Sequence, residues 1–421
     1  MAREMKNSGV KWIGEIPNEW KIKRGKYNFE KHKFIPGSKS EQYDRLALTM
    51  NGVIHRSKDD VDGLQPKDFA TYQLLRKDDL VFKLIDLQNI STSRVGLSPY
   101  TGLVSPAYII IGAIDEIIPK YAEKYYLMLW YRNIFNILGD DGIRSNLSAV
   151  DLLNVPICYP SKNEQQAIVD FLDGKCEEID GLLADLDAEV KTLAEYKKSI
   201  IAETVTRGLN PNAPMKSSGI PWTETIPAHW KTGKFRYKLK VRRISRQSDK
   251  QVLSVYREFG VIPKDSRDDN HNVTSEDTSK YKYVRPNDFV INKMKAWQGS
   301  MGVSEYEGIV SPAYFVYEFS DDDYNPRYFH YFMRNANNIP EYRRLSGGIR
   351  EGQWDLSPYD LGNMPIIVPP KSEQNEIVAC LDEKCAIIDQ SIADKQTQIE
   401  TLKSYKASLI YEYVTGKKQV I

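Results

Sequence analysis

Apolar residues recur at alternating spacings of four and three in two otherwise polar stretches, which predicts two long helices. In the first stretch the stripe consists of Leu172, Cys176, Ile179, Leu183, Leu186, Val190 and Leu193. In the second stretch it consists of Leu381, Cys385, Ile388, Ile392, Ile399 and Leu402. Stripes with this seven-residue repeat are typical of a coiled-coil seam, so each helix requires a partner.

The simplest partner for each helix is the other one in the same chain, and a coiled coil between copies of the chain is the alternative. Lys197, Lys395 and Lys406 interrupt the stripes. The first helix leads away from one globular part and the second must return, so we expect an antiparallel pair with approximate two-fold symmetry. Forty helical residues span about 60 Å. Cys176 and Cys385 lie on the seam and are expected to fill space there.

The segments outside the two helices have the mixed pattern of α+β domains. Runs rich in β-branched residues predict strands at 103–111 and 309–317. Helices are expected at 122–138 and 327–335. The proline-flanked segment 156–160 and its later copy are expected to leave each globular part as an extended strand.

The chain repeats itself once, with a period of about 209 residues. S-G-V-K-W at 8–12 returns as S-G-I-P-W at 218–222, and V-S-P-A-Y at 104–108 returns at 310–314. Further matching pairs are Leu147 and Leu356, Glu164 and Glu373, and Tyr196 and Tyr405. The repeating unit is a globular part followed by a helix.

This repeat divides the chain into four parts. We expect a globular domain at 1–160, a helix at 161–210, a second globular domain at 211–370 and a second helix at 371–421. The predicted fold class is therefore α+β, with two mixed domains separated by two long helices.

Composition excludes several classes of protein. Of the 421 residues, 41% are hydrophobic and 27% are charged, and the mean hydropathy is −0.50, as in ordinary globular proteins. No stretch approaches the roughly 18 apolar residues that a membrane helix needs, and the N-terminus has no secretory signal. The 4 cysteines form no C-x-x-C pair. We expect a cytoplasmic protein without disulfides or bound metal.

Signatures of catalysis are missing. The sequence contains no G-x-G-x-x-G, no P-loop, no G-x-S-x-G and no H-E-x-x-H. We therefore expect no catalytic residue and no cofactor bound by this chain.

Basic and aromatic residues in the globular parts point to nucleic acid. Residues 231–250 hold nine Lys or Arg and one acid, a run able to neutralise phosphates, although a solvated surface is the alternative. The segment 292–300, N-K-M-K-A-W-Q-G-S, combines side chains that read base edges with one that stacks. Its copy at 83–89 differs in residue type, as two different recognition surfaces would; simple drift is the alternative.

Two further pairs of segments, each rich in glycine beside a basic residue, complete the candidate surface. Candidate DNA-contacting residues are Arg56, Lys83, Gln88, Arg94, Arg144, Arg257, Lys264, Lys293, Lys295, Trp297, Gln298 and Arg350.

Several of these motifs together resemble a known family. They are the duplicated S-G-[VI]-x-W…I-P-x-x-W opening, V-S-P-A-Y, N-K-M-x-x-W-Q-G, the E-Q-x-x-I-V helix start and the L-x-x-Y-K-x-S-[LI]-I helix end. In this order and spacing, across residues 8–415, the chain resembles the specificity (S) subunit of type I restriction-modification systems.

The resemblance implies two target recognition domains, each reading one half of a split, asymmetric site in double-stranded DNA. It implies that the helices set the gap between the half-sites and dock two methyltransferase (M) subunits, which restriction (R) subunits join. S-adenosylmethionine, ATP and Mg²⁺ would then bind the partners, with adenine N6 methylated on a flipped base. The first domain lacks N-K-M-x-x-W-Q-G, which puts base contacts there in doubt. An autonomous methyltransferase or nuclease, and a coiled-coil scaffold without a DNA role, are the alternatives.

Overall fold

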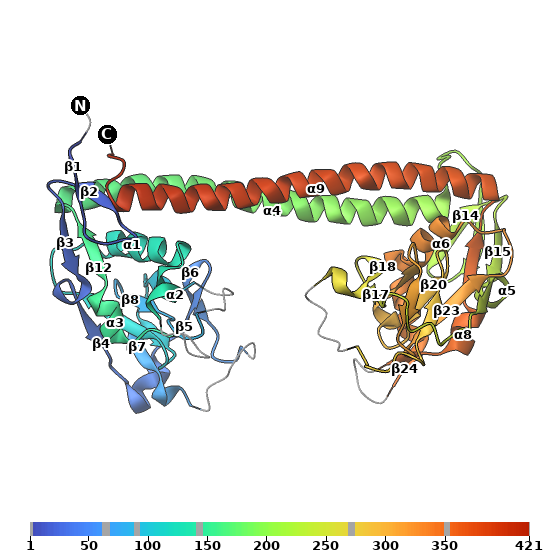
Figure 1. Ribbon diagram of the computed structural model, residues 1–421, viewed down its shortest axis with the longest axis horizontal. Helices are drawn as coiled ribbons and strands as arrows, with labels where there is room; N and C mark the ends of the chain where they lie inside the picture. The colour runs from blue at the N-terminus through green and yellow to red at the C-terminus, as the bar shows by residue number, and fades with distance from the viewer. Residues whose placement is uncertain are drawn as a thin grey trace. The chain divides into compact units, whose positions relative to one another are not determined.

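The computed structural model divides the chain into two compact units. It describes residues 3–60, 68–87, 93–139, 146–267, 274–348 and 354–420. Unit 1 comprises Met1–Asp187 together with Thr397–Ile421, and unit 2 comprises Ala188–Gln396. The long helices α4 (Lys162–Arg207) and α9 (Lys371–Val414) each contribute one part to either unit (Figure 1). The predicted combination of mixed α and β domains with two long helices is confirmed.

Domain 1, the globular part of unit 1, contains two four-stranded sheets of order β6-β5-β10-β7 and β4-β11-β8-β9, together with two strand pairs, β1-β2 and β3-β12. Its strands are β1 (Met5–Asn7), β2 (Glu15–Pro17), β3 (Lys21–Arg24), β4 (Phe29–His32), β5 (Arg45–Thr49), β6 (Gly52–Arg56), β7 (Gln73–Leu75), β8 (Leu80–Phe82), β9 (Val95–Leu97), β10 (Gly102–Val104), β11 (Ile109–Ala113) and β12 (Pro156–Tyr159). Its helices are α1 (Pro119–Tyr131), α2 (Ile134–Leu138) and α3 (Ala149–Asn154).

Domain 2, the globular part of unit 2, repeats this topology. The sheet β16-β23-β20-β21 corresponds to β4-β11-β8-β9, and the pairs β17-β18 and β19-β22 correspond to the two halves of the other sheet. Its strands are β13 (Met215–Ile220), β14 (Thr223–Pro227), β15 (Lys231–Lys234), β16 (Leu239–Val241), β17 (Leu253–Tyr256), β18 (Gly260–Pro263), β19 (Lys282–Val284), β20 (Phe289–Asn292), β21 (Met301–Val303), β22 (Gly308–Val310), β23 (Tyr314–Phe319), β24 (Ser346–Gly347), β25 (Asp355–Leu356) and β26 (Pro365–Val368). Its helices are α5 (Phe235–Lys238), α6 (Pro326–Met333), α7 (Ile339–Arg344) and α8 (Pro358–Asn363).

One small core is repeated residue for residue between the two domains. In domain 1 its seven buried members are Leu46, Leu48, Val53, Leu75, Val81, Val104 and Ile110. In domain 2 they are Leu253, Val255, Val261, Val284, Val290, Val310 and Val316. Each pair of equivalent side chains is aliphatic and similar in size, as a close-packed interior requires. The two domains are therefore built on one scaffold.

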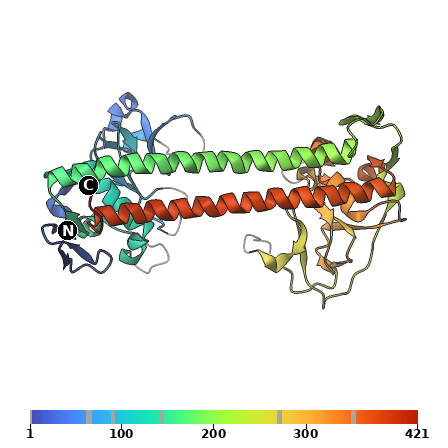
Figure 2. The same ribbon diagram turned by 90° about the horizontal axis from the view of Figure 1, so that it is seen from above.

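Within each unit the segments of α4 and α9 run antiparallel (Figures 1 and 2). In unit 1 the ring of Phe171 lies 4.4 Å from that of Tyr413, and Asp180 pairs with Lys406 at 2.6 Å. As the residue number of the α4 partner rises, that of the α9 partner therefore falls. The thirteen apolar residues assigned to the seam are all buried or half-buried.

The lysines that interrupt the seam reach acidic residues on the facing helix. Lys197 pairs with Asp389 at 2.6 Å, and Lys395 pairs with Glu189. The Asp180–Lys406 pair of unit 1 and the Lys197–Asp389 pair of unit 2 join equivalent positions of the repeat. The interruptions thus become ion pairs at the edge of the seam.

A buried tryptophan and a glutamate join each domain to the start of its helix. The Trp20 indole N–H donates to Glu164 at 2.8 Å in unit 1, and the Trp230 indole N–H donates to Glu373 at 2.9 Å in unit 2. Trp20 is 1% exposed and Trp230 is fully buried. The repeated tryptophans of the sequence thus fasten each domain to its helix.

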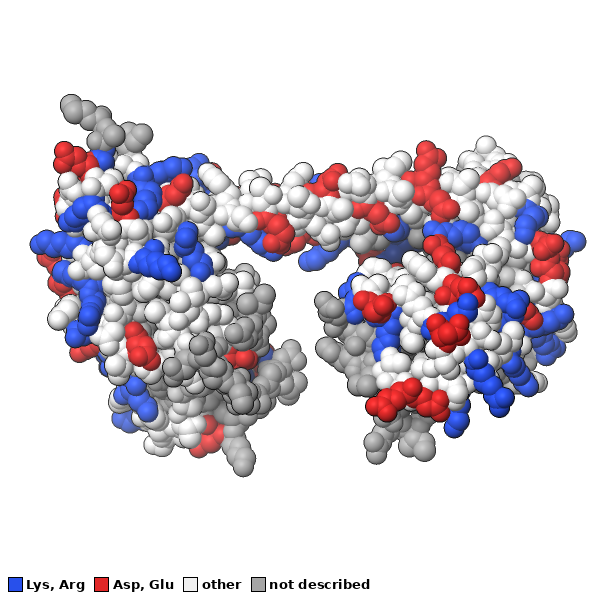
Figure 3. Space-filling model, in the orientation of Figure 1, with Lys and Arg blue, Asp and Glu red and all other residues white. Residues whose placement is uncertain are grey.

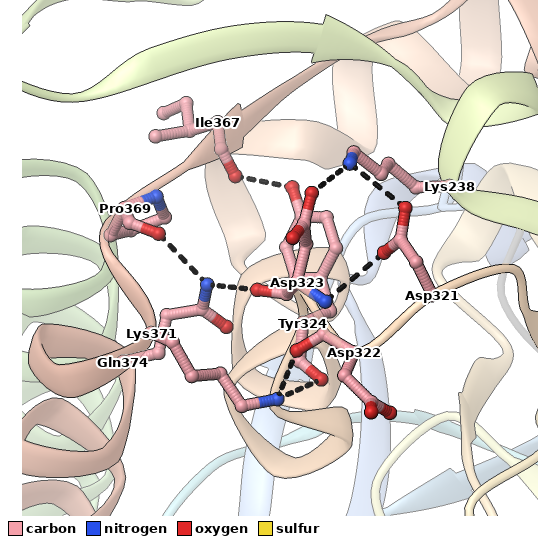
Figure 4. A network of polar contacts seen from close by, with 9 residues as sticks. All are labelled: Lys238, Asp321, Asp322, Asp323, Tyr324, Ile367, Pro369, Lys371 and Gln374. Atoms are coloured by element: carbon pink, nitrogen blue, oxygen red, sulfur yellow. Dashed lines mark hydrogen bonds and ion pairs between the residues drawn. The ribbon is translucent and has the colours of Figure 1, made fainter.

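A buried glutamine follows each of these glutamates and strengthens the junction. Gln165 accepts the Ile118 N–H at 2.8 Å and donates to the Pro160 carbonyl. Gln374 accepts from the Asn325 N–H. Figure 4 shows its amide donating to the carbonyls of Asp323 and Pro369. Since both glutamines are fully buried, these hydrogen bonds replace the water that each amide would otherwise bind.

The prediction of a single helix at 122–138 is wrong in one respect. It is broken into α1 and α2, because Asn133 adopts a left-handed conformation with φ of 56°. Asparagine tolerates this region of backbone space better than most residues. The other expected helix, 327–335, is present as α6, and the expected exit strands are present as β12 and β26.

Candidate nucleic-acid interface

The loop that follows β20 carries most of the candidate residues of domain 2. Lys295 is exposed, whereas the Lys293 ammonium pairs with Asp355 at 3.0 Å. The loop ends at Gly299, whose φ of 82° is a conformation that favours glycine. The next residue, Ser300, is buried and donates its hydroxyl to the Val255 carbonyl. The loop is therefore tied to strand β17.

Two tryptophans and an arginine form an aromatic cluster beside this loop. The rings of Trp297 and Trp354 lie 5.5 Å apart, and the Arg343 guanidinium lies 6.0 Å from the first and 5.4 Å from the second. The Trp297 indole N–H is buried and meets no hydrogen-bond acceptor among the residues that the structure describes. The cluster packs Trp297 against the domain, so this side chain is partly used in holding the loop.

The turn between β17 and β18 is held by one guanidinium. Arg334 donates to the carbonyls of Arg257 and Glu258, both at 2.8 Å, and also to those of Tyr256 and Met301. The candidate Arg257 is exposed on this turn. Because Met301 begins the strand that follows the β20 loop, Arg334 joins the turn and the loop into one surface.

The other described candidates of domain 2 are Gln298, in the loop, and Lys264, which follows the turn and β18. Gln298 is half-buried in the short helix at Ala296–Gln298. Lys264 follows β18, and its ammonium donates to the Thr274 hydroxyl. Lys264 is therefore held by its own domain.

The basic run at 231–250 divides into paired and exposed residues. Lys238 pairs with Asp321 and Asp323 (Figure 4), Arg242 is buried against Asp288, and Lys250 pairs with Glu307. The exposed members are Lys231, Lys234, Arg236, Lys240, Arg243 and Arg246. Basic side chains gather on the right-hand side of unit 2 in Figure 3, where Figure 1 shows β15 and α5.

In domain 1 the loop after β8 is held from within by Arg94. Its guanidinium donates to the carbonyls of Lys83, Ile85 and Asp86, the last at 2.7 Å. Arg94 is 1% exposed, so its side chain does not reach the surface. Its expected role as a DNA contact is corrected: a guanidinium committed to backbone carbonyls inside the domain positions the loop.

The remaining described candidates of domain 1 keep polar groups at the surface. Lys83 is half-buried, and its partial burial lowers the pKa of the ammonium. Arg56 ends β6 and pairs with Asp60 at 2.7 Å. Gln88, Arg144 and Arg350 lie outside the described residues.

The structure thus brings together Lys293, Lys295, Trp297 and Gln298 on one loop, with Arg257 on an adjoining turn. Sequence reasoning missed Arg334, because it lies at the end of a helix whose other residues read as core. The equivalent residue of domain 1 is Leu127, and this exchange of leucine for arginine was the available signal.

No metal or membrane feature emerges from the parts of the chain that the structure describes. Within the described ranges, no group of three or more His, Cys, Asp or Glu could hold a metal ion. Among the helices of those same ranges, none is long and apolar enough to cross a membrane.

A family model matches part of domain 2 and most of α9. Residues 244–401 match the family described as "Type I restriction modification DNA specificity domain". This region includes the turn, the loop and most of α9. Over these residues the match agrees with the resemblance seen in the sequence. No curated protein matches the chain.

One solved structure shares the fold over nearly the whole chain, and two others are similar at lower scores. One, from a study titled "Structural basis underlying complex assembly and conformational transition of the type I R-M system", has a TM-score of 0.68 at 14% identity, covering 96% of this chain and 99% of that one. The HsdS subunit from Thermoanaerobacter tengcongensis has a TM-score of 0.48 at 18% identity, covering 96% and 98%. The S subunit from M. genitalium has a TM-score of 0.37 at 13% identity, covering 97% and 99%. The first of these likenesses confirms the expected fold class.

Proposed function

We propose that this chain is the DNA-specificity subunit of a type I restriction-modification complex and is not itself catalytic. Each globular domain would read one half of a split, asymmetric site in double-stranded DNA. The family match at 244–401 supports this function directly for domain 2. For domain 1 the support is structural, because it has the same topology and the same small core.

The observation that carries the proposal is one scaffold bearing two different sets of loops. Equivalent core residues differ only in the size of an aliphatic side chain, whereas the loop after β8 and the loop after β20 differ in charge and aromatic content. A pair of enzymes would need to keep the same reactive groups in both copies. Two readers of different base sequences need the same framework and different contact residues.

Base readout in domain 2 would come from the turn and the loop. Lys295 and Arg257 are exposed and reach outward from a tied backbone. Arg and Lys donate to the guanine edge in the major groove, and Gln298 could pair with adenine. The exposed Lys and Arg side chains of the 231–250 run would then bind DNA phosphates, which gives affinity without sequence preference.

Catalysis would belong to partner subunits. Two methyltransferase subunits would dock on this chain, with restriction subunits joining through them. S-adenosylmethionine would supply the methyl group there, and ATP and Mg²⁺ would serve translocation and cleavage. The expected setting is the cytoplasm.

Exchange of a single domain tests the proposal. The chain is co-expressed with its methyltransferase partner, and N6-methyladenine is mapped at base resolution across the host genome. Replacement of residues 1–160 by the matching domain of a related chain should change one half of the methylated site and leave the other half intact.

Two results would contradict the proposal. A change in both halves would show that the domains do not read independently. Methyl transfer by the purified chain alone, given DNA and S-adenosylmethionine, would instead favour an autonomous enzyme. A catalytically inactive methyltransferase partner is the matched control, because methylation that persists with it must come from another source.

A further inference from the structure

In each domain a largely buried guanidinium holds the backbone of a candidate DNA-reading segment, but the segments held by Arg94 and by Arg334 are not equivalent. Arg94 donates to three carbonyls of residues 83–86 in domain 1. Arg334 donates to carbonyls of residues 256–258 and to that of Met301 in domain 2. Both segments carry candidate DNA contacts, Lys83 in the first and Arg257 in the second.

In neither case can the equivalent residue of the other domain donate the same hydrogen bonds to loop carbonyls. Arg94 directly precedes β9, and Ser300 directly precedes the equivalent strand β21. Arg334 lies eight residues after the proline that begins α6, and Leu127 lies eight residues after the proline that begins α1. Neither a serine nor a leucine can donate several hydrogen bonds in one plane, as a guanidinium does.

Burying these two guanidinium groups is costly, which argues that the loop geometry matters. Desolvation lowers the pKa of Arg94, and it lowers that of Arg334 to about 10. An apolar side chain such as Leu127 fills the equivalent space without that cost, since it packs against the core. The arginines therefore serve the position of the loop backbone more than the packing of the domain.

The turn held by Arg334 leaves little room for a different course of the chain. Gly260 ends the turn with φ of 75°, and a Cβ added there would come within 3.2 Å of His330 and 3.4 Å of the Arg334 guanidinium. The turn also exposes Phe259, which is 50% exposed. One guanidinium thus determines how Arg257 and Phe259 are presented.

We propose that Arg94 and Arg334 are positioning residues, each of which sets the base selectivity of its own domain by holding the backbone of one DNA-reading segment. This inference rests on the proposed function. Hydrogen bonds to base edges depend on the alignment of donor and acceptor, so a loop that moves by a fraction of an ångström loses discrimination before it loses affinity for phosphates.

The test uses the complete methyltransferase complex and a library of sites with single-base changes in either half. Arg334→Met keeps much of the side-chain volume and removes every donor. We expect discrimination between the correct and incorrect bases to fall about tenfold in the half-site read by domain 2, which is the loss of about one good base contact. Discrimination in the other half-site should not change.

Arg94→Met is the reciprocal experiment, and each variant controls for the assembly of the other. It should lower discrimination about tenfold in the half-site read by domain 1 and leave the other half-site unchanged. A merely structural role would reduce methylation at all sites together and leave the base preferences as they are. Arg327→Met is a further matched control, because Arg327 lies on α6 and contacts the surface acids Glu305 and Asp382 and the ring of Tyr331, none of which belongs to the turn or the loop.

If a methionine variant fails to assemble, the lysine variant is read instead. Lysine keeps the charge and some donors but loses the planar fork, so Arg334→Lys should give about a threefold loss of discrimination. Base preferences equal to those of the unmodified complex, in the methionine or the lysine variants, would overturn the inference. Absence of split-site methylation in the unmodified complex would instead overturn the proposed function, so the two failures are distinct.

Discussion

Domains 1 and 2 share a core but stabilise their loops by different means. Their seven-residue cores match side chain for side chain, and both are joined to a long helix by the same tryptophan–glutamate pair. The loops, by contrast, depend on Arg94 in one domain and Arg334 in the other. The comparison teaches that a duplicated chain has kept its framework uniform while each surface acquired its own internal support.

A second difference lies at one position of the helix that covers each sheet. Glu123 accepts the Leu97 N–H in domain 1, and His330 accepts the Val303 N–H in domain 2. The geometry of the contact is the same while the chemical group differs. The framework thus tolerates changes in side chain provided that the acceptor remains.

The largest expected effect tests the shared junction. Trp20→Ala and Trp230→Ala each empty a buried site and leave a glutamate without its indole donor, so each should lower the free energy of unfolding by about 3–5 kcal/mol. Urea unfolding of the full chain, followed by circular dichroism, measures both. Equal losses would support equivalent junctions. A loss below about 1 kcal/mol in either variant would show that the two junctions differ.

The next largest effect is a dependence of stability on pH that comes from His330 in domain 2. Burial and the nearby Arg334 lower the pKa of His330 to about 3 in the folded protein. In the unfolded chain the pKa of a histidine is about 6.5. The unfolded state therefore binds more protons as the pH falls, and stability should decrease by about 1 kcal/mol per pH unit from pH 6 to pH 4. His330→Gln keeps an acceptor for the Val303 N–H and should reduce this slope.

Urea midpoints at a series of pH values measure that slope, and Glu123→Gln in domain 1 is the matched control. A slope that is the same with and without His330 would contradict the assignment. Since domain 1 has no histidine at this position, any remaining pH dependence must come from other groups.

The smallest effect concerns the ion pairs that the repeat forms twice. Lys197→Met and Lys406→Met each remove one partly exposed pair, so each should cost about 0.5 kcal/mol at low salt and less at high salt. Thermal unfolding at two salt concentrations measures this. An effect that is large in one variant and absent in the other would break the equivalence of the two pairs.

Much of the fold was predictable because it depends on local periodicity and repetition. The seven-residue stripes predicted both helices, and the repeat predicted two domains of one topology. The break at Asn133 was missed, because a single left-handed residue leaves the apolar pattern on either side intact. Such a break depends on tertiary packing more than on local pattern.

The candidate interface was predictable in part. The loop at 292–300 stood out by composition, but Arg94, expected to contact DNA, is buried, as charged residues rarely are. Its burial depends on carbonyls of a loop eight to eleven residues away. Arg334 was missed for the converse reason, since three of its four carbonyl partners are on a turn more than seventy residues earlier. Sequence patterns carry little information on contacts at such distances.

The ion pairs between α4 and α9 also disfavour an alternative way of folding. Asp180 and Asp389 occupy equivalent positions of the repeat, as do Lys197 and Lys406. If the two helices instead paired in parallel and in register, each residue would face its own copy, and like charges would meet at both places. Ion pairs at the edge of a seam add little to stability, but repulsion in the competing arrangement widens the energy gap between the two. A chain made of two similar halves is prone to such mispairing, and these four side chains select the direction in which its helices join.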